Sequence, residues 1–180
     1  EGASIPIAFV TAAYTLEEVG RLQAGERVLI HAAAGGVGLA AVQIAQRLGA
    51  EVIATAGSEK KRDYLRSLGV AHVFDSRTLA FAGQIKELTG GRGVDLVLNS
   101  LAGDFIAASL SLLAPGGRFV EIGKSGLLTP EQAAALGQNR QYRSVFLGDQ
   151  FVQEPETIKA LLANILAAFT RGELRPLPLR

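Results

Sequence analysis

The sequence of 180 residues contains no cysteine, no methionine and no tryptophan. Without cysteine there can be no disulfide bond and no zinc site built on thiolates, and the composition fits a reducing compartment, so we expect a cytoplasmic protein. A chain without an initiator methionine has been either processed or cut from a longer polypeptide, and we favour the second explanation.

Strong charge and long apolar runs are missing as well. The formal net charge is +1, which gives no electrostatic reason to expect nucleic acid or an acidic membrane surface as a partner. No apolar run reaches the ~18 residues of a transmembrane helix, and the first residues lack the pattern of a secretory signal. The two histidines, His31 and His72, have no paired spacing, so we interpret both as structural and expect no metal.

What the sequence does have is 21 glycines and a hydrophobic content of 48%, enough for the core of one domain. The most informative glycines stand in RVLIHAAAGGVG, which begins at Arg27. Val28–Ile30 is an apolar run typical of a buried parallel strand, and the apolar spacing that follows predicts a helix over 37–48. Strand, glycine turn and helix together predict a dinucleotide-binding unit, in which the helix N-terminus faces a pyrophosphate.

This glycine motif can be aligned in two ways. Gly36-x-Gly38-x-x-Ala41 places alanine last, and Ala33-x-Gly35-x-x-Gly38 places alanine first; the sequence leaves both open. In either alignment the backbone must approach the pyrophosphate closely, which small residues allow. The residues expected to hold the pyrophosphate are Ala34, Gly35, Gly36, Val37 and Gly38.

Periodicity along the chain predicts strands that alternate with helices. Strands are expected over 28–30, 51–55, 72–75, 94–99, 118–122 and 142–147, and helices over 5–19, 37–48, 58–68, 79–88, 104–113, 129–136 and 155–170. Ser4, Ser58 and Thr129 are expected to cap helices, and Gly49 and Gly69 to end them. The alternation predicts an α/β fold over 1–180: a doubly wound parallel sheet of the Rossmann type, with helices on both faces.

Ligands bind such sheets beyond the carboxyl ends of the strands. After the second strand, no carboxylate stands where an NAD site usually holds the ribose hydroxyls. Ser58, Lys60, Lys61 and Arg62 stand there instead, at the start of a helix. A hydroxyl, cations and a helix N-terminus suit a 2′-phosphate, so we expect NADPH, with Ser58, Lys61 and Arg62 as contacts. The alternative is an ordinary solvated helix face.

The fourth and fifth strands end in the segments expected at the nicotinamide. Asn99, Ser100 and Leu101 stand at the end of the fourth strand, and Ile122 and Gly123 stand at the end of the fifth. Lys124 comes next and could donate a proton or polarise a carbonyl, and Asp149, after the sixth strand, could partner it. A surface lysine and a loop carboxylate are the alternatives.

Four segments carry a family resemblance: HAAAGGVGLAAVQIAQRLGAEV, GGRGVDLVLNSLAG, GGRFVEIGK and RGELRPLP. They resemble the nucleotide-binding half of the medium-chain dehydrogenases/reductases, and within them the enoyl reductase domains of type I polyketide synthases and fatty acid synthases. The resemblance implies NADPH-dependent reduction of an α,β-unsaturated thioester on an acyl carrier protein, with hydride added at the β-carbon. It also implies neighbouring synthase domains as partners, and Lys124 and Asp149 as candidate acid groups.

The same resemblance implies that the substrate-binding half lies outside this chain. We therefore expect little catalysis by these 180 residues alone. Two other functions remain open from the sequence: a quinone or alkenal reductase of the same superfamily, and a structural remnant that binds the cofactor weakly or not at all.

Overall fold

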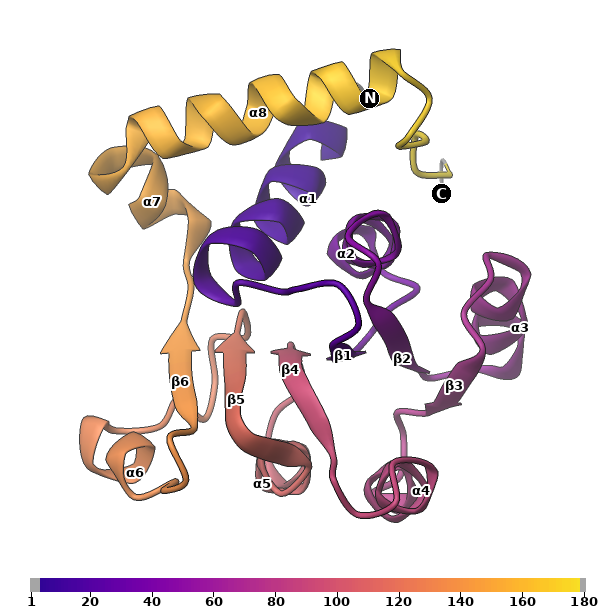
Figure 1. The fold of residues 1–180 in the computed structure, drawn as a ribbon, viewed down its shortest axis with the longest axis vertical. Helices are drawn as coiled ribbons and strands as arrows, with labels where there is room; N and C mark the ends of the chain where they lie inside the picture. The colour runs from indigo at the N-terminus through magenta and orange to yellow at the C-terminus, as the bar shows by residue number, and fades with distance from the viewer. Residues whose placement is uncertain (1–3, 179–180) are drawn as a thin grey trace.

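The computed structural model describes residues 4–178, and it contains one six-stranded sheet with all strands parallel. The strand order is β3-β2-β1-β4-β5-β6, and Figure 1 shows the strands with helices on either side. The strands are β1 (Arg27–Ile30), β2 (Glu51–Ala56), β3 (His72–Asp75), β4 (Val94–Asn99), β5 (Leu113–Glu121) and β6 (Gln141–Ser144). The helices are α1 (Ser4–Ala13), the π-helix η1 (Tyr14–Val19), α2 (Gly36–Arg47), α3 (Glu59–Ser67), α4 (Ala80–Leu88), α5 (Asp104–Leu110), α6 (Pro130–Ala134), α7 (Leu147–Gln153) and α8 (Pro155–Thr170).

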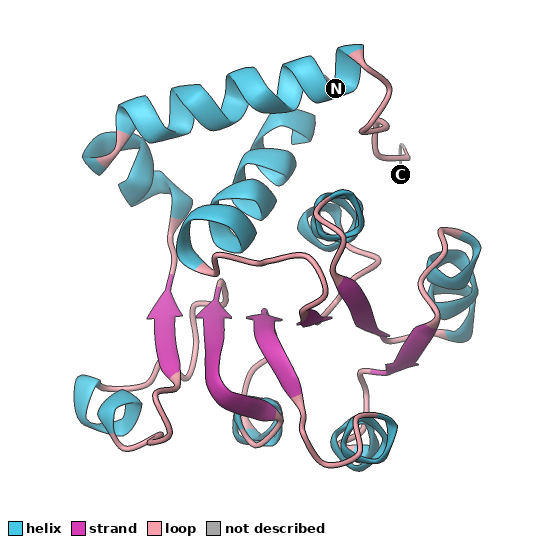
Figure 2. Ribbon diagram, in the orientation of Figure 1, coloured by secondary structure: helices cyan, strands magenta, loops and turns pink. Residues whose placement is uncertain are grey.

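Each face of the sheet has its own hydrophobic core. One core joins the sheet to α1, α2, α3 and α8, with Phe9, Ile44 and Leu65 fully buried in it. The other joins it to α4 and α5 through Phe81, Ile85 and other apolar residues. Figure 2 shows these helices as two layers around the strands. The predicted doubly wound sheet of six strands with helices on both faces is confirmed.

Several local signals in the sequence fold as predicted. Ser58 caps α3 by accepting a hydrogen bond from the Lys61 N–H at 3.4 Å. Thr129 caps α6 in a reciprocal capping box with Gln132. Gly49 follows Leu48, the C-cap of α2, with a φ of +78°, as a helix-ending glycine should. The side chain of Ser4, the other predicted cap, lies outside the described part of the chain.

Several predicted boundaries are wrong. The helix expected over 104–113 ends at Leu110, and β5 begins at Leu113 instead of residue 118, because the Val94 N–H already bonds to Leu112 and Val94 pairs with Leu113. The helix expected over 5–19 changes to a π-helix at Tyr14. At this point the hydroxyl of Thr15 donates to the carbonyls of Thr11 and Ala12 in the preceding turn, a bond that competes with the regular helical pattern.

The predicted end of the last strand is wrong as well. The strand expected over 142–147 stops at Ser144, and the chain then forms α7, which was not predicted. Asp149 consequently lies in the first turn of a helix and not in a loop. A short apolar run such as the one around Phe146 fits a strand and a helix equally well in the sequence.

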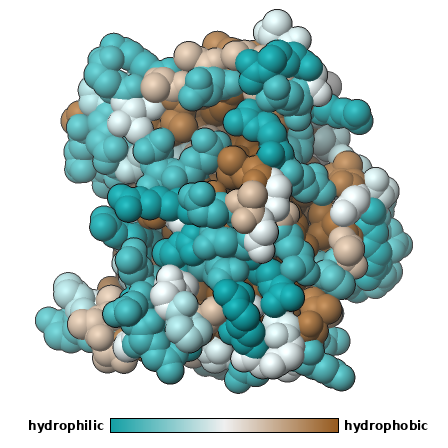
Figure 3. All heavy atoms as spheres, viewed as in Figure 1, coloured by the Kyte–Doolittle hydropathy of each residue, from teal (hydrophilic) through white to brown (hydrophobic). Residues whose placement is uncertain are grey.

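The outside of the molecule is mixed in polarity. Figure 3 shows one face on which apolar side chains form small patches among hydrophilic ones. Among the described residues, no helix combines the length and the apolar character needed to cross a bilayer.

Candidate functional site

The site is defined by the point at which the strand order reverses. β1 lies between β2 and β4, so the chain leaves β1 toward one edge of the sheet and later returns to the other side of β1. In open α/β sheets a crevice forms there, beyond the carboxyl ends of the strands. The glycine turn follows β1 at this point, the segment 57–62 follows β2, and the segments 100–103 and 122–125 follow β4 and β5. The predicted residues of these four segments therefore lie along one edge.

The geometry of the turn after β1 decides between the two alignments of the glycine motif. Ala32 has a φ of +48°, and its carbonyl accepts the Gly35 N–H at 2.9 Å. A Cβ on Gly38 would lie 2.5 Å from that carbonyl oxygen and 2.6 Å from the Cα of Ala33. Glycine at 38 is therefore required for close packing of the helix on the turn, which is the role of the third glycine of the motif. The alignment Ala33-x-Gly35-x-x-Gly38 is the one adopted.

Gly36 has a different role from Gly38. Gly35 is the N-cap of α2 and Gly36 is the first helical residue. A Cβ on Gly36 would meet nothing within 4 Å, and the residue is exposed. The fold itself therefore does not require glycine at this position. The N–H groups of a first helical turn have no partner inside the helix and carry the positive end of its dipole, so this turn presents an anion-binding surface.

Beside the turn is a cavity of about 280 Å³ at the ends of β1, β2 and β3. Lys61 lines it, as the prediction of a 2′-phosphate contact requires. Arg77 lines it too, and its Nε donates to the Gly57 carbonyl at 2.6 Å. Sequence reasoning missed Arg77, although it comes two residues after the third strand and so at the same edge. The other residues that line the cavity are Ala32, Ala34, Gly35, Ala56, Gly57 and Ser76.

Arg62, the second cation predicted to contact a phosphate, is occupied by other groups. Its Nη2 donates to Glu59 at 2.6 Å, and its Nη1 donates to the Ala56 carbonyl at 3.0 Å and lies 3.3 Å from Asp75. The Arg62 side chain is only 14% exposed. These contacts join α3 to the ends of β2 and β3. Of the two cations that the sequence proposed as carriers of NADPH preference, only Lys61 lines the cavity.

The segments after β4 and β5 are held by two fully buried polar side chains, Asn99 and Glu121. The Asn99 Nδ2 donates to Glu121 at 2.6 Å and to the Leu101 carbonyl at 2.8 Å. The other oxygen of Glu121 accepts the Gly123 N–H at 2.7 Å. Burial raises the pKa of Glu121, while the hydrogen bonds from Asn99 and Gly123 act in the opposite direction.

The Asn99 side chain is buried, and its hydrogen bond to the Leu101 carbonyl holds the turn at Ser100 and Leu101. Ser100 is exposed, and Leu101, Ile122 and Gly123 are partly exposed, so these four predicted residues border the edge itself. Glu121 was not among the predicted site residues. The signal for it in the sequence was a charge in the otherwise apolar end of a strand, directly before the predicted site.

Lys124 and Asp149 are both exposed. Lys124 follows the end of β5, and Asp149 lies in α7, where its N–H donates to the Phe146 carbonyl. Within the described part of the chain no ion pair links their side chains, so the structure does not bring the two together as a pair. Their proposed acid roles remain predictions.

The two histidines have different surroundings. His31 follows β1 and is buried; its Nε2 lies 2.7 Å from Ser109 Oγ and its Nδ1 lies 2.8 Å from Thr55 Oγ1. Ser109 donates its own proton to the Phe105 carbonyl, so Nε2 must carry the histidine proton and Nδ1 must accept from Thr55. Burial lowers the pKa of His31 to about 3. His72 lies in β3, 3.8 Å from Glu51.

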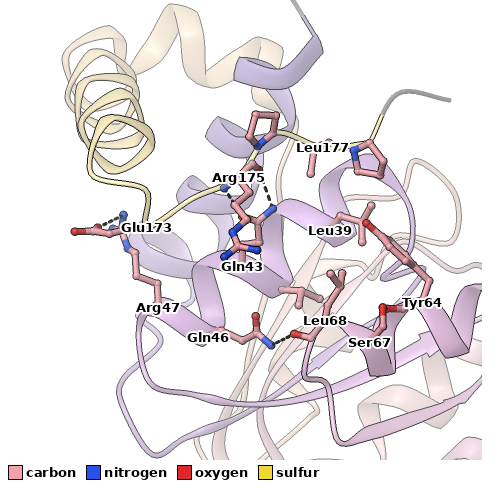
Figure 4. Close-up of a pocket in the computed structure, with 13 residues that line it drawn as sticks. Leu39, Gln43, Gln46, Arg47, Tyr64, Ser67, Leu68, Glu173, Arg175 and Leu177 are labelled. Carbon is pink, nitrogen blue, oxygen red and sulfur yellow. Dashed lines mark hydrogen bonds and ion pairs between the residues drawn. The ribbon is translucent and has the colours of Figure 1, made fainter.

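A larger cavity, of about 740 Å³, lies away from this edge (Figure 4). It is a groove between the outer sides of α2 and α3 and the segment 173–178. Gln43 holds that segment by bonding to both the N–H and the carbonyl of Arg175. No strand end opens into this groove, so we do not assign it to the dinucleotide.

A family model described as zinc-binding dehydrogenase matches residues 36–167. The chain is 49% identical over 180 residues to the pikromycin polyketide synthase component PikAII of Streptomyces venezuelae, a match that covers 99% of this chain and 5% of that protein.

Solved structures agree with this relationship. The CurK enoyl reductase matches with a TM-score of 0.94 and 48% identity, over 99% of this chain and 53% of the other. The nucleotide-binding subdomain of the enoylreductase domain of PpsC from Mycobacterium tuberculosis matches with a TM-score of 0.87 and 47% identity, over 96% and 98% of the two chains. Mycobacterial Rv1454c, in a structure complexed with NADPH, matches with a TM-score of 0.81 and 31% identity, over 93% and 52%.

The family's description names zinc, which the residues of this chain do not fit. The sequence has no cysteine, His31 is buried and uses both ring nitrogens, and the described residues include no cluster of three or more potential metal ligands. We therefore derive no step through a metal. The sheet order, the glycine turn and the matches along nearly the whole chain agree with one another. The chain belongs to the zinc-binding dehydrogenase family, in the branch that contains the enoyl reductase domains of polyketide synthases.

Proposed function

We propose that this chain is the NADPH-binding part of an enoyl reductase that reduces an α,β-unsaturated acyl thioester carried by an acyl carrier protein. The observation that carries the proposal is the glycine turn, where Gly38 is required by packing while Gly36 leaves the first turn of α2 open to an anion. Two relatives support it: one is an enoyl reductase by name, and one is complexed with NADPH.

The residues of the chain divide the cofactor into three regions. The backbone of 34–38 would hold the pyrophosphate, the residues at the ends of β2 and β3 would hold the adenosine half, and those at the ends of β4 and β5 would hold the nicotinamide. This order follows from the strand order, because β2 and β4 flank β1 on opposite sides. The bound cofactor supplies a hydride. Lys124, exposed beyond β5, then donates the proton that completes reduction at the α-carbon, with Asp149 as the second candidate donor.

The preference for NADPH is carried by Lys61, with Arg77 as a second cation. Both line the cavity beside Gly57, and Ser58 caps the helix that begins there. Arg62 is left out of this role, because Glu59 and Asp75 already neutralise it. The chain covers 53% of the CurK enoyl reductase, so we assign it to the nucleotide-binding half of the enzyme, with a second half that completes the substrate cleft and with neighbouring synthase domains as partners.

Titration of the 180-residue chain with NADPH and with NADH, followed by nicotinamide fluorescence, tests the cofactor. We expect saturable binding with NADPH the tighter ligand; binding of neither cofactor would refute the proposal and favour a structural remnant. In the complete enzyme, turnover with a crotonyl thioester and none with a quinone is expected. The reverse result would identify a quinone or alkenal reductase.

A further inference from the structure

A row of buried polar side chains lies beneath the cofactor edge. In the register of the sheet, Ile30 pairs with Ala54 and with Leu98, so the next residue, His31, lies level with Thr55 and Asn99, and Asn99 pairs with Glu121. All four side chains are buried. This level of the sheet thus carries polar groups across β2, β1, β4 and β5: Asn99 and Glu121 are the last residues of β4 and β5, His31 directly follows β1, and Thr55 is the next-to-last residue of β2.

Glu121 is the one member of this row that ionises as an acid, and its contacts differ from those of a surface carboxylate. It is fully buried, and no ion pair is formed with it by any described residue. Its two oxygens accept instead from Asn99 Nδ2 and from the Gly123 N–H. A carboxylate is an acceptor on both oxygens, which matches two donors. A buried carboxylate costs stability unless such bonds compensate it, so its presence calls for an explanation other than packing.

The backbone that these bonds hold is the segment proposed for the nicotinamide. The Gly123 N–H is fixed by Glu121, and Lys124 is the next residue. Asn99 connects the same carboxylate to the Leu101 carbonyl after β4. A Cβ on Gly123 would lie 2.8 Å from the Glu121 carboxylate oxygen, so the two groups are in direct contact.

We propose that Glu121 is a positioning residue for the nicotinamide end of the cofactor: its buried carboxylate fixes the backbone at Gly123, and through Asn99 the turn at Leu101, so that both strand ends keep one spacing. The inference rests on the proposed binding of NADPH. It predicts that loss of the carboxylate affects the nicotinamide end and leaves the adenosine and pyrophosphate end unchanged.

The test compares Glu121→Gln with a matched control, Glu17→Gln, in the 180-residue chain. The amide that replaces the carboxylate presents a donor and an acceptor to two donors, so one of the two bonds must fail. Glu17 is partly buried, and burial raises its pKa as it does that of Glu121, but Glu17 lies in η1 and pairs with Arg47. Each protein is titrated with NADPH and with 2′-phospho-ADP-ribose, which lacks only the nicotinamide.

For Glu121→Gln we expect NADPH affinity to fall by about tenfold or more, the effect of one charged hydrogen bond, and affinity for 2′-phospho-ADP-ribose to stay unchanged. Glu17→Gln should bind both ligands like the parent. Equal affinity of Glu121→Gln and the parent for NADPH would overturn the proposal, and so would an equal loss for both ligands, which indicates a purely structural role.

A second measurement does not depend on a folded variant. In the parent chain, the NMR signal of the Gly123 amide proton should shift when NADPH is added and stay in place with 2′-phospho-ADP-ribose. An unmoved signal, or the same shift with both ligands, would overturn the inference. If the parent binds neither ligand, the proposed function fails, and the inference fails with it. If the parent and Glu121→Gln bind NADPH equally well, only the inference fails.

Discussion

Replacing Gly36 with valine should separate cofactor binding from folding, because Gly36 and Gly38 have different surroundings. A side chain at 36 extends into open space, and valine is a somewhat better helix former than glycine, so the free energy of unfolding should stay within about 1 kcal/mol of the parent. The same side chain stands between the backbone and the proposed pyrophosphate. Loss of one charge-assisted hydrogen bond, about 1.5–3 kcal/mol, weakens binding by roughly 10- to 150-fold.

Gly38→Ala, in contrast, should lower the free energy of unfolding. Its Cβ would lie 2.5 Å from a carbonyl oxygen and 2.6 Å from a Cα, both backbone atoms that cannot rotate away. Overpacking of this kind costs about 1–3 kcal/mol, which lowers the melting temperature by about 2–12 °C for a chain of this size.

Thermal melts followed by circular dichroism and NADPH titrations on the same samples measure both effects. Gly83→Val is the matched control, because Gly83 is also an exposed helical glycine in open space but lies in α4. It should change neither property. The reasoning is refuted if Gly36→Val binds NADPH like the parent, or if it melts as early as Gly38→Ala.

Three further predictions concern charged and buried groups. Lys61→Ala and Arg77→Ala should each weaken NADPH binding and spare NADH, whereas Arg62→Ala should mainly lower the melting temperature; an equal loss of both cofactors in Lys61→Ala would contradict the phosphate role. In the complete enzyme, Lys124→Ala should lower kcat by roughly 10²–10⁴-fold with little change in NADPH affinity, and unchanged turnover would argue against a proton donor. The folded-state pKa of His31, about 3, lies below its ordinary value of 6.5, so the stabilisation from the neutral ring is complete above pH 6.5. It is lost as the pH falls from there toward 3, at up to about 1.4 kcal/mol per pH unit. Denaturant unfolding at several pH values should therefore give a flatter profile for His31→Asn than for the parent, and parallel profiles would contradict this assignment.

The sequence predicts the architecture well because its signals are local. Val28–Ile30, the glycine turn and the amphipathic helix after it each follow from residues next to one another, and the same is true of the Ser58 and Thr129 caps. The edge of the sheet that forms the site then follows from the alternation of strands and helices alone. The alternation thus places the four segments proposed for the cofactor at one edge of the sheet, without any knowledge of side-chain contacts.

The parts that sequence reasoning missed depend on contacts between distant residues. The choice between the two motif alignments rests on the Ala32 carbonyl, whose position comes from a positive φ at a residue other than glycine. Lys61 and Arg62 are neighbours in α3 with similar chemistry, yet Asp75, at the end of β3, pairs with Arg62 and not with Lys61.

The role of Glu121 also depends on a contact between distant residues. A lone acidic residue in a strand suggests either an exposed position or a buried partner, and only the pairing of β4 with β5 places Asn99 opposite it. With this pairing, the carboxyl end of β5 carries two residues with separate proposed roles. Residue 121 faces inward and holds the backbone, while Lys124, three residues later, is exposed at the edge where the proposed chemistry occurs. A charge that looks misplaced in a buried strand can therefore indicate where a parallel sheet fixes its ligand-binding loops.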